Sequence, residues 1–358
     1  MWKMWQIKQF ITILGVIVCT VLYCHFVMKV SHQDEAIKKL AATISQLKLR
    51  NFDEDSKKDI LADFVNNGED TKIPYDDLLI IYNRVPKTAS TSLMGVVYDL
   101  CKRNNFHVLH INTTRNVHVM SLSDQRRFIE NVTSWQDKKP ALYHGHIAFL
   151  NFQRYGISQR PIYINLIRKP LDRLVSYYYF LRYGDDFRPY VVRKRKGNTV
   201  TFDECVERQE NDCDPENMWL QIPFFCGLHV DCWEPGNNWA LAQSKQNLVE
   251  HYMVVGVTEE LEDFVALLEV VLPRFFHGAT QQFLKGKKSH LRKTYNKVDP
   301  APETVRKIKS SKIWSMENDF YEFTLKQFHA MKKRTLIEKR GVLQDGGQRF
   351  FFEKIRPR

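Results

Sequence analysis

Short apolar runs alternate with helical stretches along the middle of this chain, and this alternation restricts its fold more than any other feature. Residues 78–82 (LLIIY) suit a buried strand, and residues 92–102 then repeat apolar side chains with helical spacing. Residues 162–167 (IYINLI) form a second such strand, which a helical stretch at 171–181 follows. Buried strands joined by helices predict an α/β domain with a mostly parallel sheet, whose ligands bind at the carboxyl ends of the strands. Long amphipathic helices are also expected at 261–271 and 313–332.

The amino-terminal part of the chain predicts a membrane anchor. Residues 10–28 are 19 consecutive residues without Asp, Glu, Lys or Arg, which is about the length that a helix needs to cross a bilayer. A cleaved signal peptide is the alternative, but the run is longer than a typical signal core and no small-residue cleavage site follows it.

A stem is expected between this anchor and the folded domain. Ile37, Leu40, Ile44 and Leu47 have the spacing of a short coiled coil, although a solvated stem helix would have the same pattern. We therefore expect a cytoplasmic tail at 1–9, the anchor at 10–28, a stem and linker at 29–72, and one folded domain at 73–358.

Two Asn-x-Thr sequons, which begin at Asn112 and Asn131, indicate that the large domain enters the secretory lumen. Such sequons matter as glycosylation sites only in that compartment. With an amino-terminal anchor and a luminal domain behind it, the chain is expected to be a single-pass type II membrane protein.

Four cysteines lie close together: Cys205, Cys213, Cys226 and Cys232. In an oxidising compartment this cluster predicts two disulfides, for which three connectivities are possible. A zinc site is the alternative, but the cluster contains no Cys-x-x-Cys pair. No metal is therefore expected.

The loop after the first predicted strand, residues 84–92 (RVPKTASTS), combines a lysine with four hydroxyl side chains. It leads into the amino terminus of a helix, whose N–H groups and dipole favour a phosphate or sulfate. A P-loop for ATP or GTP needs glycines before Lys87, and this segment has none. The loop predicts an anion site that resembles a P-loop without its glycines. A Ser/Thr-rich helix cap beside a solvated lysine is the alternative.

A second anion-binding segment follows the second predicted strand. Arg168 leaves the end of that strand, Pro170 suits the first turn of a helix, and Ser176 lies about two turns along it. The guanidinium fork and the hydroxyl suit a phosphate group. A plain capped helix with surface arginines would have the same composition.

Together these two segments resemble the 5'-phosphosulfate loop and the 3'-phosphate site of sulfotransferases that use 3'-phosphoadenosine-5'-phosphosulfate (PAPS). The runs 82–92 (YNRVPKTASTS), 143–146 (YHGH) and 176–182 (SYYYFLR) are similar to the heparan sulfate 2-O-sulfotransferase family. The likeness extends from about residue 78 to about residue 328. Lys169 departs from the family pattern, which usually has Asp before the proline, and this leaves the local loop contacts open.

The resemblance implies a single sulfotransferase domain with a P-loop-like core, which releases PAP as product and uses no metal. It also implies a Golgi membrane location, a homotrimer and an association with glucuronyl C5-epimerase. The implied acceptor is a uronic acid of heparan sulfate, mainly iduronic acid. A dermatan or chondroitin uronyl 2-O-sulfotransferase, or a catalytically silent heparin-binding membrane protein, remains as an alternative.

Site residues follow from the same resemblance, position by position. The 5' side of the donor would be held by Arg84, Lys87, Thr88, Ala89, Ser90, Thr91 and Ser92. The 3'-phosphate would be held by Arg168 and Ser176, and Lys293 and Thr294 would close over the donor. Acceptor contacts would come from Arg84, His110, Tyr177, Arg188, Arg193 and Arg292.

Residues 144–146 (HGH) supply the candidate base. Sulfuryl transfer to an alcohol needs a group that takes the hydroxyl proton, and a neutral imidazole, with an ordinary pKa of about 6.5, is suited to this step. Two exposed loop histidines or half of a metal site are the alternatives. The resemblance makes His146 the base and gives His144 the role of positioning the substrate or the base, while Lys87 stabilises developing charge.

A basic segment at 188–196 (RPYVVRKRK) adds to a chain whose formal net charge is +12. Such a surplus indicates an anionic partner: nucleic acid, acidic lipid or a sulfated polysaccharide. A luminal domain does not meet nucleic acid, so a groove for a polyanionic glycan is expected, joined by Lys287, Lys288, Arg292 and Lys293. Lys285 and part of the basic segment would then be a solvated charged face.

Overall fold

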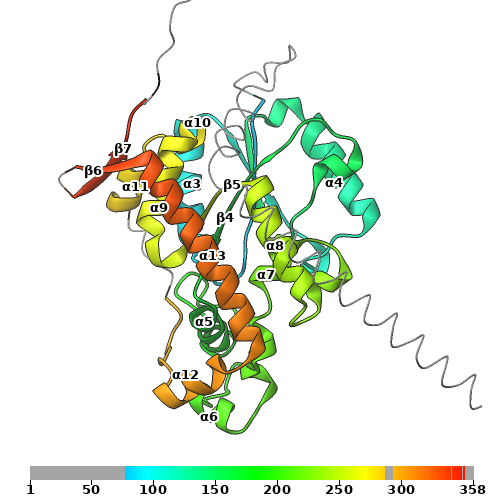
Figure 1. Cartoon of the computed structure of the whole chain (residues 1–358), viewed down its shortest axis with the longest axis vertical. Coiled ribbons are helices and arrows are strands. Elements are labelled where there is room, and N and C mark those ends of the chain that lie inside the picture. Colours follow the sequence, from blue (N-terminus) through cyan, green and yellow to red (C-terminus); the bar gives the residue numbers. More distant parts are fainter. Residues whose placement is uncertain (1–76, 287–292, 340, 349, 351–358) are drawn as a thin grey trace, which may run out of the picture. The chain divides into compact units, whose positions relative to one another are not determined.

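Five parallel strands form the central sheet, which confirms the predicted α/β class (Figure 1). Their order in the sheet is β2-β3-β1-β4-β5. The strands are β1 (Leu79–Asn83), β2 (His107–Ile111), β3 (Ala141–Gly145), β4 (Ile162–Ile167) and β5 (Tyr252–Val257). The strands β1, β3 and β4 are buried along their whole length, as expected for a parallel sheet covered on both faces. A separate antiparallel hairpin joins β6 (Leu336–Lys339) to β7 (Val342–Asp345).

The computed structural model describes residues 77–286, 293–339, 341–348 and 350. These residues belong to one compact unit that spans Lys72–Arg358. The predicted tail, anchor, stem and coiled coil lie outside the described residues, and so does Arg292. Within the described ranges, no helix is both long enough and apolar enough to cross a membrane.

The predicted strand at 78–82 corresponds to β1 shifted by one residue, because Asn83 continues the strand. Asn83 pairs with Gly145 of β3, and its buried amide donates to the Phe224 carbonyl oxygen at 3.2 Å. The Tyr252 hydroxyl donates to the Asn83 side-chain oxygen at 3.0 Å. A polar residue that looked like the start of a loop is therefore a fully bonded part of the strand.

Helices cover both faces of the sheet. In Figure 1, α3, α9, α10 and α11 lie together on one side of the strands, and α4, α7 and α8 lie on the other. The long helix α13 packs against β5 and α8. The helices are α3 (Ser90–Arg103), α4 (Leu122–Ser134), α5 (Pro170–Tyr183), α6 (Phe202–Glu207), α7 (Gln221–Cys226), α8 (Asn238–His251), α9 (Leu261–Val271), α10 (Pro273–Phe276), α11 (Ala279–Lys285), α12 (Pro302–Lys309) and α13 (Lys312–Thr335).

The four predicted helices correspond to α3, α5, α9 and α13, and α9 has the predicted bounds. Helix α3 begins two residues earlier than predicted, at Ser90, because the turn that starts it is made by Ala89 in a left-handed conformation. No sequence pattern indicated this start, since left-handed conformations usually fall on glycine or asparagine.

The connections that follow β1 and β4 run in opposite directions. The chain passes from β1 through α3 to β2 at one edge of the sheet, and from β4 through α5 and later helices to β5 at the other edge. In open parallel sheets, ligands bind where the loops of two neighbouring strands diverge in this way. Since β1 and β4 are neighbours, both predicted anion-binding segments begin at that point.

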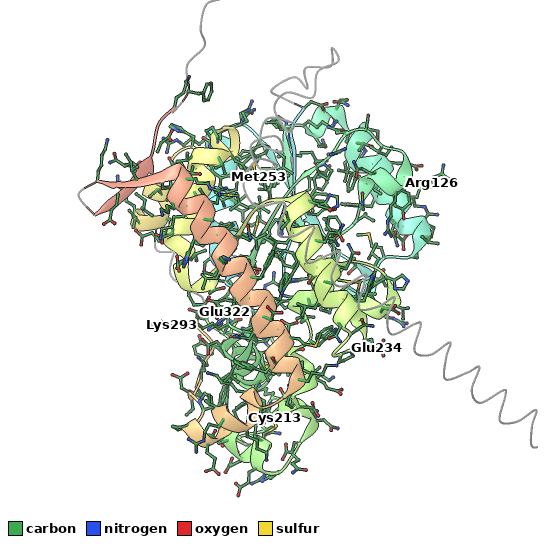
Figure 2. The ribbon with its side chains drawn as sticks, viewed as in Figure 1. Arg126, Cys213, Glu234, Met253, Lys293 and Glu322 are labelled. Carbon is green, nitrogen blue, oxygen red and sulfur yellow. A yellow bond between two sulfur atoms is a disulfide. The ribbon has the colours of Figure 1, made fainter. Side chains whose placement is uncertain are left out.

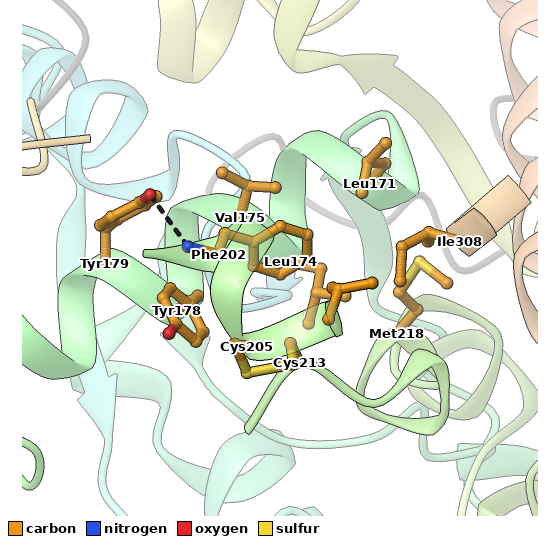
Figure 3. Close-up of a cluster of buried hydrophobic side chains, with 11 residues drawn as sticks. Leu171, Leu174, Val175, Tyr178, Tyr179, Phe202, Cys205, Cys213, Met218 and Ile308 are labelled. Atoms are coloured by element: carbon orange, nitrogen blue, oxygen red, sulfur yellow. Dashed lines mark hydrogen bonds between the residues drawn. A yellow bond between two sulfur atoms is a disulfide. The ribbon is translucent and has the colours of Figure 1, made fainter. Parts of the chain in front are cut away.

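A cluster of buried apolar side chains fixes α5 against α6 and α12 (Figure 3). Leu174 and Phe202 are fully buried at its centre, and the Phe202 N–H donates to the Tyr179 hydroxyl at 3.2 Å. The whole cluster contains Leu171, Leu174, Val175, Tyr178, Tyr179, Phe202, Cys205, Val206, Cys213, Met218 and Ile308. It supports α5, the helix that carries Ser176, from the side away from the sheet.

Two disulfides join Cys205 to Cys213 and Cys226 to Cys232. This is the local arrangement among the three connectivities that the sequence permits. The first bond closes a short segment that contains Asp212, and the second closes the segment after α7.

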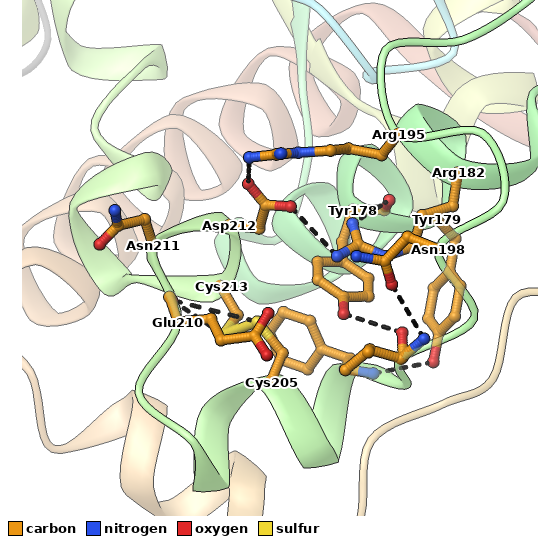
Figure 4. Close-up of polar contacts among 12 residues, drawn as sticks. Tyr178, Tyr179, Arg182, Arg195, Asn198, Cys205, Glu210, Asn211, Asp212 and Cys213 are labelled. Carbon is orange, nitrogen blue, oxygen red and sulfur yellow. Dashed lines mark hydrogen bonds and ion pairs between the residues drawn. A yellow bond between two sulfur atoms is a disulfide. The ribbon is translucent and has the colours of Figure 1, made fainter.

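Asp212 lies between two arginines beside the first disulfide (Figure 4). Its carboxylate is 3.1 Å from the fully buried Arg182 guanidinium and 2.7 Å from that of Arg195. Arg182 also lies over the Tyr178 ring, 3.5 Å from its centroid. The disulfide therefore holds the carboxylate that ties the basic segment 188–196 to α5.

Candidate active site

The loop after β1 takes a conformation that glycine usually provides. Lys87 and Ala89 have φ angles of 69° and 56°, in the left-handed region. Non-glycine residues in this region are strained, and such strain is concentrated at ligand sites. The buried Thr88 hydroxyl donates to the Val85 carbonyl oxygen at 2.9 Å and braces the turn. The loop is thus bent like a P-loop although it lacks the glycines.

Helix α3 begins directly after this bend, with an amino terminus suited to an anion. Its N-cap residue, Ala89, has no side chain that accepts a hydrogen bond from the first turn. The hydroxyl-bearing Ser90 and Ser92 are buried, and Thr91 is half-buried. Backbone N–H groups and the helix dipole favour negative charge at such a terminus.

The side chain of Lys87 reaches a segment more than 200 residues away along the chain. Its Nζ donates to the Thr294 hydroxyl at 3.3 Å and lies 4.2 Å from the centroid of the Phe180 ring. Two residues predicted to act on the same donor, Lys87 and Thr294, are therefore in contact. Sequence reasoning missed Phe180, because a phenylalanine in a helical pattern predicts only packing.

Arg168 follows β4 and lies beside the same loop. Its Nη1 donates to the Lys87 carbonyl oxygen at 3.4 Å. Ser176 is buried on α5, whose first residue is Pro170, as predicted. The Lys169 side chain is exposed and its backbone N–H donates to Glu259 at 3.0 Å, so the departure at Lys169 places a cation at the surface.

His146 comes directly after β3, with its ring orientation set by the loop after β1. Its Nδ1 is 2.8 Å from the Arg84 carbonyl oxygen. A carbonyl only accepts, so Nδ1 carries the proton and Nε2 is the basic nitrogen. That Nε2 lies 3.5 Å from an Arg84 guanidinium nitrogen. Burial and the positive charge of Arg84 lower the pKa of His146 to about 4, which keeps the ring neutral at neutral pH.

A third histidine, His118, holds the chain on the far side of His146. Its Nδ1 donates to the His146 carbonyl oxygen at 2.9 Å, and its own carbonyl accepts from the Ala148 N–H at 2.9 Å. The His118 ring stacks on Trp233 and contacts Phe224. Because Trp233 directly follows the second disulfide, that bond supports the position of the candidate base.

His144 lies within β3 and is buried, so it is not one of two exposed loop histidines. Its Nε2 is 2.8 Å from the Tyr98 hydroxyl, and its ring stacks on His110, which is its register neighbour on β2. Among the described residues, nothing bonds to the buried Nδ1. Burial first, and then Arg84, lower the pKa of His144 to about 3, and they lower the pKa of His110 as well.

The glycine between the two histidines is required by the sheet. A Cβ on Gly145 would lie 2.6 Å from the Ile111 carbonyl oxygen and 2.7 Å from the Ile111 Cβ. The close approach of β2 to β3 therefore excludes any side chain here, and it brings His110 against His144.

A buried carboxylate joins the basic segment to Thr294, the residue that Lys87 contacts. Asp185, which is fully buried, lies 3.6 Å from the Arg193 guanidinium and accepts from the Arg188 N–H at 3.3 Å. It also forms a backbone bridge with Thr294. The Arg193 guanidinium lies 4.3 Å from the centroid of Phe180, the ring that Lys87 also contacts. Asp185 and Phe180 thus connect the predicted donor and acceptor residues.

Exposure divides the predicted acceptor contacts. Arg188 is exposed and Tyr177 is 38% exposed. Lys293, which was predicted to close over the donor, also lies at the surface (Figure 2). In contrast, the Arg193 side chain is only 15% exposed and faces Asp185. The structure brings the donor residues and both histidines to one end of the sheet, and it leaves Arg193 largely inside the protein.

The sulfotransferase family model matches residues 70–324 of the chain. The chain belongs to the sulfotransferase family. Heparan sulfate 2-O-sulfotransferase 1 of Xenopus laevis is 51% identical over 97% of this chain and 96% of that protein. The human protein of the same name is 57% identical over 79% of this chain and 80% of its own length. The heparin sulfate O-sulfotransferase of Drosophila melanogaster is 56% identical over the same shares.

The three predicted motifs meet at the carboxyl ends of adjacent strands. Lys87 follows β1, His146 follows β3 and Arg168 follows β4, and these three strands are adjacent. Tyr98 was missed, although it lies seven residues after Thr91 on α3, which is the spacing of one helix face. In the described part of the chain, no group of three or more His, Cys, Asp or Glu could hold a metal ion; metal independence stays a prediction.

Proposed function

We propose that this sulfotransferase transfers a sulfuryl group from PAPS to the 2-hydroxyl of a uronic acid, mainly iduronic acid, in heparan sulfate. The observation that carries the proposal is the meeting of Lys87, Arg168 and His146 at the carboxyl ends of adjacent strands. The relatives named as heparan sulfate 2-O-sulfotransferases support this acceptor and position.

The donor site would be formed by the loop after β1 and by the start of α5. Arg84 and residues 87–92 would hold the 5' side, and Arg168 with Ser176 would hold the 3'-phosphate, while Lys293 and Thr294 close over the donor. The left-handed bend at Lys87 and Ala89 and the bare amino terminus of α3 fit a sulfate or phosphate. When bound, PAPS would supply the sulfuryl group, and PAP would leave.

His146 would act as the general base. Its Nδ1–H is committed to the Arg84 carbonyl, so Nε2 can take the proton of the acceptor hydroxyl as the new oxygen–sulfur bond forms. Lys87 and the N–H groups of α3 would stabilise the negative charge that develops during an in-line displacement. One such donor is typically worth roughly 3 to 4 kcal/mol in the transition state.

Acceptor binding would use the side chains near the histidines and on the basic segment. Arg84, His110, Tyr177, Arg188, Arg193 and Arg292 are the proposed contacts, and His144 would position the sugar. The buried Nδ1 of His144 supports this role, because a buried polar atom normally has a partner that completes it.

The setting that we propose for this activity is the Golgi lumen. Residues 1–9 would be cytoplasmic, 10–28 would anchor the chain, 29–72 would form the stem, and 73–358 would be luminal. Asn112 and Asn131 have exposed side chains, which supports glycosylation at both. A homotrimer, and an association with glucuronyl C5-epimerase, are further parts of the proposal.

The experiment that tests the function is PAP release from PAPS with a panel of purified glycans. Transfer to heparan sulfate, with the product disaccharide 2-O-sulfated by mass spectrometry, is expected. If dermatan or chondroitin were the preferred acceptor, the assignment of heparan sulfate as the acceptor would be wrong. Glycan binding without PAP release under any condition would refute an enzymatic role.

A further inference from the structure

The side chain of Gln221 forms two hydrogen bonds with the backbone of Arg168. The Arg168 N–H donates to the Gln221 Oε1 at 2.8 Å, and the Gln221 Nε2 donates back to the Arg168 carbonyl oxygen at 3.0 Å. Gln221 is the first residue of α7 and is fully buried. A side-chain amide that satisfies both polar groups of one residue fixes its backbone much as a strand partner would.

The orientation of this amide is set by Glu317 on α13. The second N–H of Gln221 Nε2 donates to Glu317 Oε2 at 3.2 Å. The other carboxylate oxygen, Oε1, accepts from the backbone N–H groups of Leu220 and Ile222 at 2.9 and 3.1 Å. Glu317 is fully buried, and burial raises its pKa while the nearby Arg173 guanidinium opposes that shift.

Residues on both sides of Arg168 are held in the same manner. The Thr258 hydroxyl donates to the Ile167 carbonyl oxygen at 3.0 Å, and the Lys169 N–H donates to Glu259 at 3.0 Å. Three consecutive residues at the end of β4 therefore have their backbone fixed by side chains from other parts of the chain. Glu317 accepts three hydrogen bonds in this network, and a buried polar network with its bonds satisfied is rigid.

We propose that Gln221 and Glu317 are positioning residues for the 3'-phosphate of the donor. They hold the Arg168 backbone so that its guanidinium is already aimed when the nucleotide arrives, which reduces the entropy lost on binding. This inference rests on the proposed function, in which Arg168 contacts that phosphate. The network should therefore raise the affinity for a nucleotide that has a 3'-phosphate and leave the affinity for one without it unchanged.

The test compares two nucleotides on the full-length chain by calorimetry: PAP, and adenosine 5'-monophosphate, which lacks the 3'-phosphate. Gln221→Ala should raise the Kd for PAP roughly tenfold, which is at the low end for the loss of a hydrogen bond to a charged group. The Kd for adenosine 5'-monophosphate should change by no more than about twofold. Glu317→Gln keeps the side-chain size but places an N–H donor where the Gln221 amide needs an acceptor. It should also lower the preference for PAP over adenosine 5'-monophosphate.

Asn247→Ala is the matched control. Asn247 is also a buried amide that holds the backbone of α7, but at its other end, through the Phe225 and Cys226 carbonyls at 2.8 and 2.9 Å. This variant should lose thermal stability to a similar degree as Gln221→Ala and keep the wild-type ratio of the two affinities.

An Arg168→Ala arm separates the inference from the assignment on which it rests. If Arg168→Ala loses PAP selectivity and neither Gln221→Ala nor Glu317→Gln does, the positioning role is wrong. An equal loss for both nucleotides in Gln221→Ala would likewise reduce the network to a structural one. If Arg168→Ala itself keeps full selectivity, the 3'-phosphate site lies elsewhere and that part of the proposed function is overturned.

Discussion

The proposed donor side and the proposed acceptor side of the candidate site are built in different ways. The donor loop is one continuous segment, residues 84–92, which joins β1 to α3. The proposed acceptor side uses residues 184–196, and these pair with residues 293–295, which would close over the donor. The pairing consists of the Asp185–Thr294 bridge and of the Tyr295 N–H, which donates to the Gly184 carbonyl at 3.3 Å. The functional groups of a continuous motif can be recognised from the order of its residues. A surface formed by distant segments depends on the contacts that hold those segments together.

The difference is sharpest in the charges. Lys87 contacts the Thr294 hydroxyl and lies over the Phe180 ring. On the acceptor side, Arg193 faces Asp185 and Arg195 faces Asp212. Part of the basic segment therefore serves the fold, and its strength as a glycan site is less than its composition suggests.

His146→Ala is expected to produce the largest effect, because the proposed base acts in the chemical step and binds neither the donor nor the acceptor. Its removal should lower kcat by roughly 10² to 10⁴, the usual contribution of a general base, while the Kd for PAP stays unchanged. His107→Ala, which removes an exposed histidine on β2, is the control. Near-normal kcat in His146→Ala would shift the search for the base to His144.

Lys87→Ala tests the donor side. Loss of one preorganised donor at the transferring group should lower kcat by roughly 10² to 10³, with little change in melting temperature, because the side chain is only partly buried. Lys194→Ala, a lysine exposed on the basic segment, is the matched control for charge. Wild-type turnover in Lys87→Ala would contradict the assignment of the loop.

Asp185→Asn tests whether the acceptor side is a separate unit. Asparagine can still accept from the Arg188 N–H but no longer neutralises Arg193, so the basic segment should shift. We expect the acceptor KM to rise roughly tenfold, as for a lost hydrogen bond to a charged group, with the PAP Kd unchanged. A matching loss of PAP affinity would show that the Thr294 bridge makes the two sides one unit.

The smallest effect is expected when the pH is lowered to about 5. A histidine base with an ordinary pKa would already lose activity in this range. Protonation of His146 removes its basic lone pair, and its pKa is lowered to about 4. The value of kcat should therefore stay within about twofold from pH 7.5 to pH 5, and then fall tenfold per pH unit below about pH 4. A pH–rate profile with an acidic limb near 6.5 would show that His146 is not buried in the working enzyme.

The elements that carry the candidate site could be predicted, because their patterns are local. The strand at 162–167 coincides with β4, and the loop that precedes α3 was recognised from its own residues. The sequence failed to show that His144 lies in a strand, since residues 141–145 (ALYHG) carry a histidine and a glycine that are typical of a loop. Only the close approach of Ile111 explains why that glycine is there.

The sequence by itself determined the α/β class and the cysteines that pair, and it predicted a donor loop and a candidate base. Each depends on side chains that are neighbours along the chain, whose chemistry is visible without the fold. Only the tertiary structure decided which nitrogen of His146 is basic, which arginines are neutralised, and that Gln221 and Glu317 hold Arg168. Those properties depend on burial and on contacts that the fold makes, across 62 positions between His146 and Arg84 and across 53 positions between Gln221 and Arg168, and no local pattern records them.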